Sequence, residues 1–301
     1  MTNGVGFIGA GQMGEPMVRR LLEVGVPVTT YARRPDVCDR LAAHGARLAV
    51  SVAELAASSD ILISCLFSDA QLTEIASGPE GLIANAKRGA ILVSHTTGTL
   101  ATLKSLTDHP SAPAILDAPV SGTADDIAAG NLTVLIGGPD EAVQLVSPVL
   151  AAYANPIVPT GELGSALALK LINNVLFAAN AQLVAAATEL GMSMGVPPDA
   201  LLAALQVCSA GSLVAEHIQE IGGIEPFAEI AGPFLRKDFA ACLAAATEAG
   251  ADLGMLGDVV SNGPLSLESV GAKCRAHQAT FRCPVCRPSN LTSVIMSRQS
   301  R

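Results

Sequence analysis

The sequence predicts an α/β domain built on a parallel sheet, followed by an all-helical domain. Three observations support this fold class. Short apolar strands alternate with amphipathic helices through the first half of the chain. The second half holds long, Ala-rich helical stretches with no strand pattern between them. A length of 301 residues, 50% of them hydrophobic, suits two domains with separate cores.

Composition and charge exclude several classes of protein. The net charge is −9, and no basic block precedes residue 265, which argues against nucleic acid as a partner. The longest apolar region, residues 175–187, is broken by Asn180 and Gln182, so we expect no membrane-spanning helix. The chain enters its first strand without a signal-peptide pattern, and its 7 cysteines are scattered. We therefore expect a cytoplasmic protein with reduced thiols.

The first strand, Val5–Ile8, runs into a glycine-rich turn and then a helix over residues 15–24. The turn has the spacing G-x-G-x-x-G between a strand and a helix. Its first glycine allows the turn, its second lets the backbone approach a pyrophosphate, and its third lets the helix pack on the strand. The helix N-terminus presents free N–H groups to the phosphates. The pattern predicts a Rossmann dinucleotide site made of Gly9, Ala10, Gly11, Gln12, Met13 and Gly14.

The end of the second strand, residues 26–31, bears on the choice of cofactor. An NAD site usually places Asp or Glu there to hold the ribose 2′-hydroxyl. This chain has Arg33 and Arg34 instead, with no acid before Asp36. Arginine binds a phosphate bidentately, so NADP is favoured over NAD. The alternative is that both arginines belong to a solvated loop.

The alternation of strands and helices continues to residue 158. Further strands are expected over residues 47–50, 60–66, 90–94, 114–117, 132–136 and 157–158. Helices are expected over residues 37–44, 52–57, 71–75, 101–106 and 141–152. Ligands of such sheets bind beyond the carboxyl ends of the strands. Four side chains at those ends are expected beside the nicotinamide and its ribose: Phe67, Ser68, Thr96 and Thr97.

A cluster of uncharged donors follows the strand that ends at Asp117. Ser121, Gly122 and Thr123 offer backbone N–H groups and two hydroxyls. Such a cluster suits a carboxylate. Taken alone, the same residues also describe an ordinary turn.

A long apolar helix is predicted over residues 165–194. Lys170 and Asn174 are four residues apart in it, so they share one face. A lone lysine on an apolar helix usually extends to solvent. The other interpretation is that the two side chains line a site, at the junction of two domains where ligand pockets concentrate. The apolar helix also suggests a homodimer or higher homo-oligomer.

The remaining chain is expected to be helical over residues 199–208, 212–220 and 237–253. We expect three parts: a nucleotide domain over 1–162, a helical domain over 163–264, and an atypical basic tail over 265–301. The tail contains Cys274, His277, Cys283 and Cys286. Their spacing is short and irregular for zinc, so no metal site is expected.

Four segments together resemble the β-hydroxyacid dehydrogenase family, which includes 3-hydroxyisobutyrate dehydrogenase and belongs to the 6-phosphogluconate dehydrogenase superfamily. They are residues 6–14, 117–122 and 161–174 and the pair Lys237-Asp238, within roughly residues 4 to 262. The family usually has a second glycine where this chain has Thr123. The resemblance implies a carboxylate site at Ser121, Gly122 and Thr123. It also implies a catalytic Lys170, a substrate-orienting Asn174, and cofactor contacts from Thr97 and Lys237.

The resemblance implies hydride transfer between a nicotinamide and a small 3-hydroxy acid or its semialdehyde. Burial on an apolar helix face would favour the neutral form of Lys170, which a base requires. Two other functions remain open. Imine reductases share the scaffold but usually replace the lysine, and non-catalytic dinucleotide-binding modules typically lose it.

Overall fold

The computed structural model describes residues 4–266, which form two compact units. The first comprises residues 4–177 and 238–253, and the second comprises residues 178–237 and 254–266. The first unit holds the sheet, and the second is helical. The expected division at residues 162 and 264 stays a prediction, and the tail from 267 onward lies outside the described residues.

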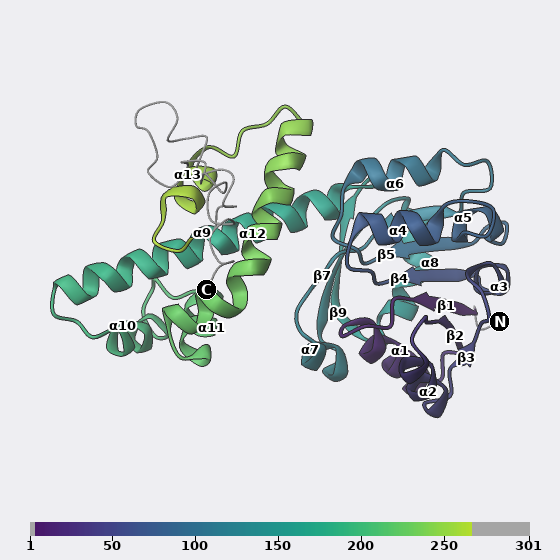
Figure 1. The fold of residues 1–301 in the computed structure, drawn as a ribbon, viewed down its shortest axis with the longest axis horizontal. Helices are drawn as coiled ribbons and strands as arrows, with labels where there is room; N and C mark the ends of the chain where they lie inside the picture. Colours follow the sequence, from purple (N-terminus) through teal and green to yellow (C-terminus); the bar gives the residue numbers. More distant parts are fainter. Residues whose placement is uncertain (1–3, 267–301) are drawn as a thin grey trace, which may run out of the picture. The chain divides into compact units, whose positions relative to one another are not determined.

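The sheet has the doubly wound order β3-β2-β1-β4-β5-β6, and these strands are all parallel. Figure 1 shows the part of this order from β3 to β5. They are β1 Val5–Ile8, β2 Val28–Tyr31, β3 Arg47–Leu48, β4 Ile61–Ser64, β5 Ile91–Ser94 and β6 Ala114–Asp117. Strand β8 (Leu132–Gly137) continues the sheet antiparallel to β6. It also pairs antiparallel with β7 (Val120–Ser121) and parallel with β9 (Ala154–Gly161).

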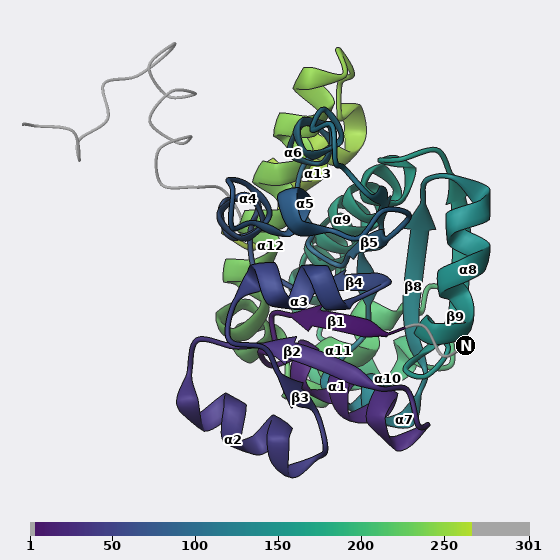
Figure 2. The same cartoon turned by 90° about the vertical axis from the view of Figure 1, so that its right-hand side faces the viewer.

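Helices cover both faces of the sheet (Figure 2). One face packs against α1 (Gly14–Glu23), α2 (Pro35–Ala43), α7 (Ala124–Ala129) and α8 (Asp140–Leu150). The other packs against α3 (Val52–Ser58), α4 (Asp69–Ala76), α5 (Leu82–Asn85) and α6 (Leu100–Thr107). Neighbouring strand residues alternate between the two cores: Phe7 and Ile63 enter the first, whereas Ile8 and Leu62 enter the second. A sheet buried on both faces explains its nearly continuous apolar strands.

The remaining helices are α9 (Ser165–Ser193), α10 (Pro198–Leu205), α11 (Leu213–Ile221), α12 (Ile224–Glu248) and α13 (Gly254–Asn262). Helix α9 has 29 residues, close to the expected span. In the second unit, the buried Gln182 amide donates to the carbonyls of Val260 and Leu265 and accepts the N–H of Leu265. This side chain therefore fixes the segment that follows α13 against α9.

The predicted fold class is confirmed, but several elements were not expected. Strand β7 and helices α5, α7 and α13 were not predicted, and α12 begins at Ile224 instead of residue 237. Helix α12 contains two prolines, Pro226 and Pro233. Pro226 lies in the first turn of α12, where its missing N–H costs nothing, and Pro233 is accommodated inside the helix.

Helix α9 is long and apolar enough to cross a membrane by length and composition. The expectation of no membrane-spanning helix stays a prediction. In its most apolar window, 44% of the residues are buried inside the protein. One such helix is weak evidence for a membrane span, because core helices have the same composition.

Candidate active site

The glycine-rich turn after β1 has the shape that a dinucleotide requires. Gly9 has φ +95°, and a side chain there would collide with the backbone of Cys65. A side chain at Gly14 would collide with the carbonyl of Gly9. A Cβ built on Gly11, in contrast, would meet no atom within 4 Å. The protein's own packing thus requires the first and third glycines, and the second leaves open the space that a pyrophosphate would enter.

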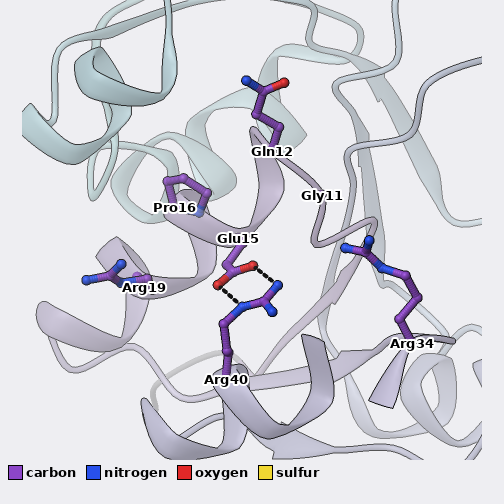
Figure 3. A pocket seen from close by; sticks show the side chains of 7 residues that line it. All are labelled: Gly11, Gln12, Glu15, Pro16, Arg19, Arg34 and Arg40. Atoms are coloured by element: carbon purple, nitrogen blue, oxygen red, sulfur yellow. Dashed lines mark hydrogen bonds and ion pairs between the residues drawn. The ribbon is translucent and has the colours of Figure 1, made fainter. Parts of the chain in front are cut away.

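A cavity of about 300 Å³ lies beside this turn (Figure 3). The residues that line it are Gly11, Gln12, Glu15, Pro16, Arg19, Arg34 and Arg40. The Arg40 guanidinium donates to both carboxylate oxygens of Glu15, at 2.9 Å each, and to Asp36 at 3.0 Å. The hydrogen bond from Arg40 lowers the pKa of the Glu15 carboxyl. Two carboxylates therefore offset the charge of Arg40.

The two arginines that favour NADP lie in different surroundings. Arg33 forms an exposed ion pair with Glu74, with an N–O distance of 3.2 Å. Arg34 lines the cavity together with Gly11, and its guanidinium extends toward the turn in Figure 3. Arg34 is thus placed nearer to the dinucleotide site than Arg33.

The loops after β4 and β5 carry the other predicted cofactor residues. Ser68 caps α4, and Phe67 beside it is 66% exposed. Thr96 is buried, and its hydroxyl has no hydrogen-bond partner within residues 4–266. Asp69 accepts hydrogen bonds from the backbone N–H and the hydroxyl of Thr99, both at 2.9 Å. This contact ties the two loops together, and half-buried Thr97 lies in the second.

His95 fixes the start of the loop after β5 through contacts of both ring nitrogens. Its Nδ1 contacts the carbonyl of Ala118, and its Nε2 lies 2.8 Å from the Tyr153 hydroxyl. Because a carbonyl only accepts, Nδ1 must carry the proton, and Nε2 accepts from Tyr153. Complete burial lowers the pKa of His95 to about 4. A neutral imidazole therefore joins the ends of β5 and β6 to β9.

Asp117 joins two of the sequence segments that resemble the dehydrogenase family. It ends β6, is fully buried, and accepts the N–H groups of Gly164 and Leu167, each at 2.8 Å. These N–H groups lie at the start of α9, where the helix dipole favours a carboxylate. The side chain thereby fixes the helix three residues before Lys170. A Cβ on Gly137 would come within 2.6 Å of Asp117 Oδ1, so a larger residue there would displace the carboxylate.

Lys170, Asn174 and Asp238 form an interacting group. The Asn174 amide donates to the Asp238 carboxylate at 2.9 Å, and the charge of Asp238 also acts on Lys170. Burial lowers the pKa of Lys170, and the negative charge of Asp238 partly opposes that effect. A third segment of the resemblance, Lys237-Asp238, thus meets the lysine helix through Asp238.

The Ser121-Gly122-Thr123 turn lies between β7 and α7. Ser121 pairs with Thr133 across the sheet, and Gly122 has φ +137°. Both the N–H and the hydroxyl of Thr123 donate to one Asp126 oxygen, at 2.6 and 2.8 Å, in a capping box. Two of the donors predicted for a substrate carboxylate are therefore already engaged.

Lys237 is an exposed residue of α12. Within residues 4–266 no group of three His, Cys, Asp or Glu side chains is arranged to hold a metal ion. The Cys274, His277, Cys283 and Cys286 set lies outside the described residues.

Sequence reasoning assigned no role to Asp117, Asp238, His95 or Asp126. Asp117 gave a usable signal, because an acid that closes an apolar strand must find hydrogen-bond donors when it is buried. Asp238 and Asp126 gave none, because their partners depend on tertiary contacts or on an unpredicted helix.

Comparison with known proteins agrees with this geometry. Residues 4–174 match the family described as the NAD binding domain of 6-phosphogluconate dehydrogenase. The chain is 31% identical over 222 residues to mouse mitochondrial 3-hydroxyisobutyrate dehydrogenase, a match that covers 73% of this chain and 66% of the mouse enzyme. It is 29% identical to 2-(hydroxymethyl)glutarate dehydrogenase of Eubacterium barkeri, over 72% of each chain.

Among solved structures, the fold is similar to 3-hydroxyisobutyrate dehydrogenase of Mycobacterium tuberculosis. The TM-score is 0.77 at 23% identity, and the match covers 87% of this chain and 92% of that one. The matched domain is one that binds a nicotinamide dinucleotide. The chain belongs to the β-hydroxyacid dehydrogenase family.

Proposed function

We propose that this protein is an NADP-preferring dehydrogenase that transfers a hydride between the nicotinamide and a small 3-hydroxy acid or its semialdehyde. The arrangement of Lys170, Asn174 and Asp238 is the observation that supports it best. A half-buried lysine whose pKa is lowered by burial, one helical turn from an amide held by a carboxylate, suits proton transfer.

The nicotinamide, when bound, accepts the hydride during oxidation and donates it during reduction. In oxidation, the neutral Nζ of Lys170 accepts the hydroxyl proton of the substrate as the hydride leaves its carbon. In reduction, the protonated Nζ returns that proton to the developing alkoxide. Burial favours the neutral form of Lys170, and Asp238 opposes this effect, so the lysine can serve in both directions.

Asn174 is the orienting residue of the proposal. Its amide nitrogen donates to Asp238, and its side chain lies on the same helix face as Lys170 one turn earlier. Asn173 donates to the amide oxygen of Asn174 at 3.2 Å, a contact that restricts the rotation of the amide. We propose that this group holds the hydroxyl of the substrate in line with Lys170.

The preference for NADP is supported by Arg34. Its place in the cavity beside Gly11 suits a phosphate on the adenosine ribose. The neighbouring carboxylates of Glu15 and Asp36 are occupied by Arg40, which reduces their repulsion of a phosphate.

A panel of short 3-hydroxy acids, assayed with NADP and with NAD, tests the activity and the cofactor together. Turnover of at least one acid is expected, at a higher kcat/KM with NADP. Lys170→Ala should lower kcat at least about 100-fold, which is the usual contribution of a general acid–base group. The affinity for the cofactor should change little. If binding of NADP is intact but no acid or aldehyde reacts, the protein is a non-catalytic binding module. If Lys170→Ala loses cofactor affinity and turnover alike, the lysine is structural.

A further inference from the structure

The turn at Ser121-Gly122-Thr123 is hydrogen-bonded to an acidic side chain, Asp126. Asp126 Oδ2 accepts from the N–H and hydroxyl of Thr123 and lies 2.9 Å from the position of a Cβ on Gly122. Asp126 N–H returns a bond to the Thr123 hydroxyl at 3.3 Å. These reciprocal contacts hold the carboxylate against the turn.

We propose that Asp126 makes this site selective for monocarboxylates and excludes substrates with a second carboxylate. The proposal rests on the proposed function, in which the turn receives the substrate carboxylate. Ser121 and Gly122 remain as the donors for that group, because both donors of Thr123 are engaged by Asp126.

The physical reason is repulsion between like charges at short range. The Asp126 oxygen lies 2.6 Å from the backbone nitrogen of Thr123, so its charge acts at short range on a group bound to this turn. The first carboxylate of a substrate offsets that repulsion with hydrogen bonds to the turn. A second carboxylate a few bonds away has no such bonds, yet it still lies within the Debye length of about 8 Å.

The hydroxyl of Thr123 completes the capping box that holds Asp126. Glycine at that position would have no hydroxyl to complete the capping box, whereas Thr123 and Asp126 hold each other in both directions. Because both donors of Thr123 bind Asp126, Ser121 and Gly122 are the residues of the turn that remain to contact the substrate.

Three probes separate charge from size. They share a hydroxymethyl group on the carbon that bears the carboxylate: 3-hydroxyisobutyrate, 2-(hydroxymethyl)pentanoate and 2-(hydroxymethyl)glutarate. The second and third have side arms of similar length, and only the third adds a carboxylate. We expect kcat/KM for the pentanoate to exceed that for the glutarate by about 10-fold or more, the scale of a like-charge contact near a protein surface.

Asp126→Asn keeps an acceptor for Thr123 and removes the charge, so it should raise kcat/KM for the glutarate about 5- to 10-fold relative to the pentanoate. Asp125→Asn, at the exposed neighbouring acid, is the matched control and should change that ratio less than 2-fold. Thr123→Gly keeps Asp126 and tests whether the hydroxyl is needed to hold it; a partial loss of discrimination is expected.

The outcomes distinguish this proposal from the proposed function. If none of the three acids reacts, the dehydrogenase assignment fails. If the acids react, but the glutarate equals the pentanoate or Asp126→Asn leaves their ratio unchanged, only the role of Asp126 is overturned. If Asp125→Asn and Asp126→Asn change the ratio of kcat/KM for the two acids equally, the effect belongs to the overall charge, and the role of Asp126 is overturned as well.

Discussion

The carboxylate of Asp117 and the backbone N–H of Leu167 are 2.8 Å apart, although 50 residues separate them in the chain. This bond, with its partner at Gly164, fixes the first turn of α9 to the end of the sheet. Lys170 follows within one turn. The position of the proposed catalytic lysine therefore depends on a fully buried acid at the end of β6.

Replacement of Asp117 should impair turnover through the helix it holds. Asp117→Ala leaves two buried N–H groups without acceptors, at about 1–3 kcal/mol each, and frees the start of α9. We expect a lower melting temperature and a kcat loss of about 10-fold or more, because misplacement of a catalytic group by about 1 Å is costly. Thermal unfolding and steady-state kinetics measure both effects.

Asp108→Ala, at an acid after α6, is the control and should change neither quantity appreciably. A stable Asp117→Ala protein with wild-type kcat would show that α9 is positioned by its other contacts.

The pH dependence of the oxidation and reduction rates should shift when Asp238 is replaced by a neutral residue. Burial lowers the pKa of Lys170, and Asp238 opposes that shift. Asp238→Asn removes the opposing charge, so the pKa of Lys170 falls further. Oxidation needs neutral Lys170, and its rate should therefore begin to rise at a lower pH; reduction needs the protonated form and should decline at a lower pH. Glu248→Gln, an exposed acid of the same helix, should leave the profiles in place. A shift to higher pH would contradict the assignment.

Arg34 should matter more than Arg33 for the 2′-phosphate. Arg34→Ser should raise KM for NADP about 10-fold or more, the usual weight of a charge-assisted hydrogen bond, with little effect on KM for NAD. Arg33→Ser is the matched control, since Arg33 already pairs with Glu74. A larger rise in the KM for NADP in Arg33→Ser than in Arg34→Ser would assign the 2′-phosphate contact to Arg33. If neither substitution changes this KM, the proposed NADP preference is contradicted.

The buried His95 should make the fold sensitive to acid. Its pKa is lowered from 6.5 to about 4, so below pH 6.5 the unfolded chain takes up a proton that the folded protein resists. Stability is thus lost as the pH falls from 6.5 to 4, by roughly 3 kcal/mol. His95→Gln should lose less stability over this window in urea unfolding. His109→Gln, at an exposed histidine, should behave as the wild type; identical slopes for all three proteins would exclude His95 as the cause.

A leucine stripe on α9 supports the expected homo-oligomer. Leu169, Leu176, Leu183 and Leu190 recur every seven residues and are between 44% and 60% exposed. A seven-residue spacing is the pattern of two helices that pack side by side. We propose pairing of this stripe with its copy in a second chain. Leu183→Glu should lower the mass measured by light scattering, whereas Val207→Glu, at an exposed site outside α9, should not. A monomeric wild type would refute the proposal.

The sequence by itself determined the elements whose signals are local. The glycines at 9, 11 and 14 predict the dinucleotide turn because each is required by a local feature or by the ligand: the tight turn, the pyrophosphate and the packing of the helix on the strand. Apolar runs bounded by loops placed β1, β4, β5 and β6 within two residues, and the four-residue spacing put Lys170 and Asn174 on one helix face. These features follow from steric and periodic rules that act over a few residues.

Only the tertiary structure decided which side chains meet. The bonds from Asp117 to the start of α9 and from Asn174 to Asp238 span 47 to 64 residues, and no periodicity encodes such pairs. The two-residue strand β7 exists because β8 supplies its partner, and the six-residue α7 exists because Thr123 and Asp126 cap it. Isolated segments of that length do not fold, since ordering them costs more than their own hydrogen bonds return.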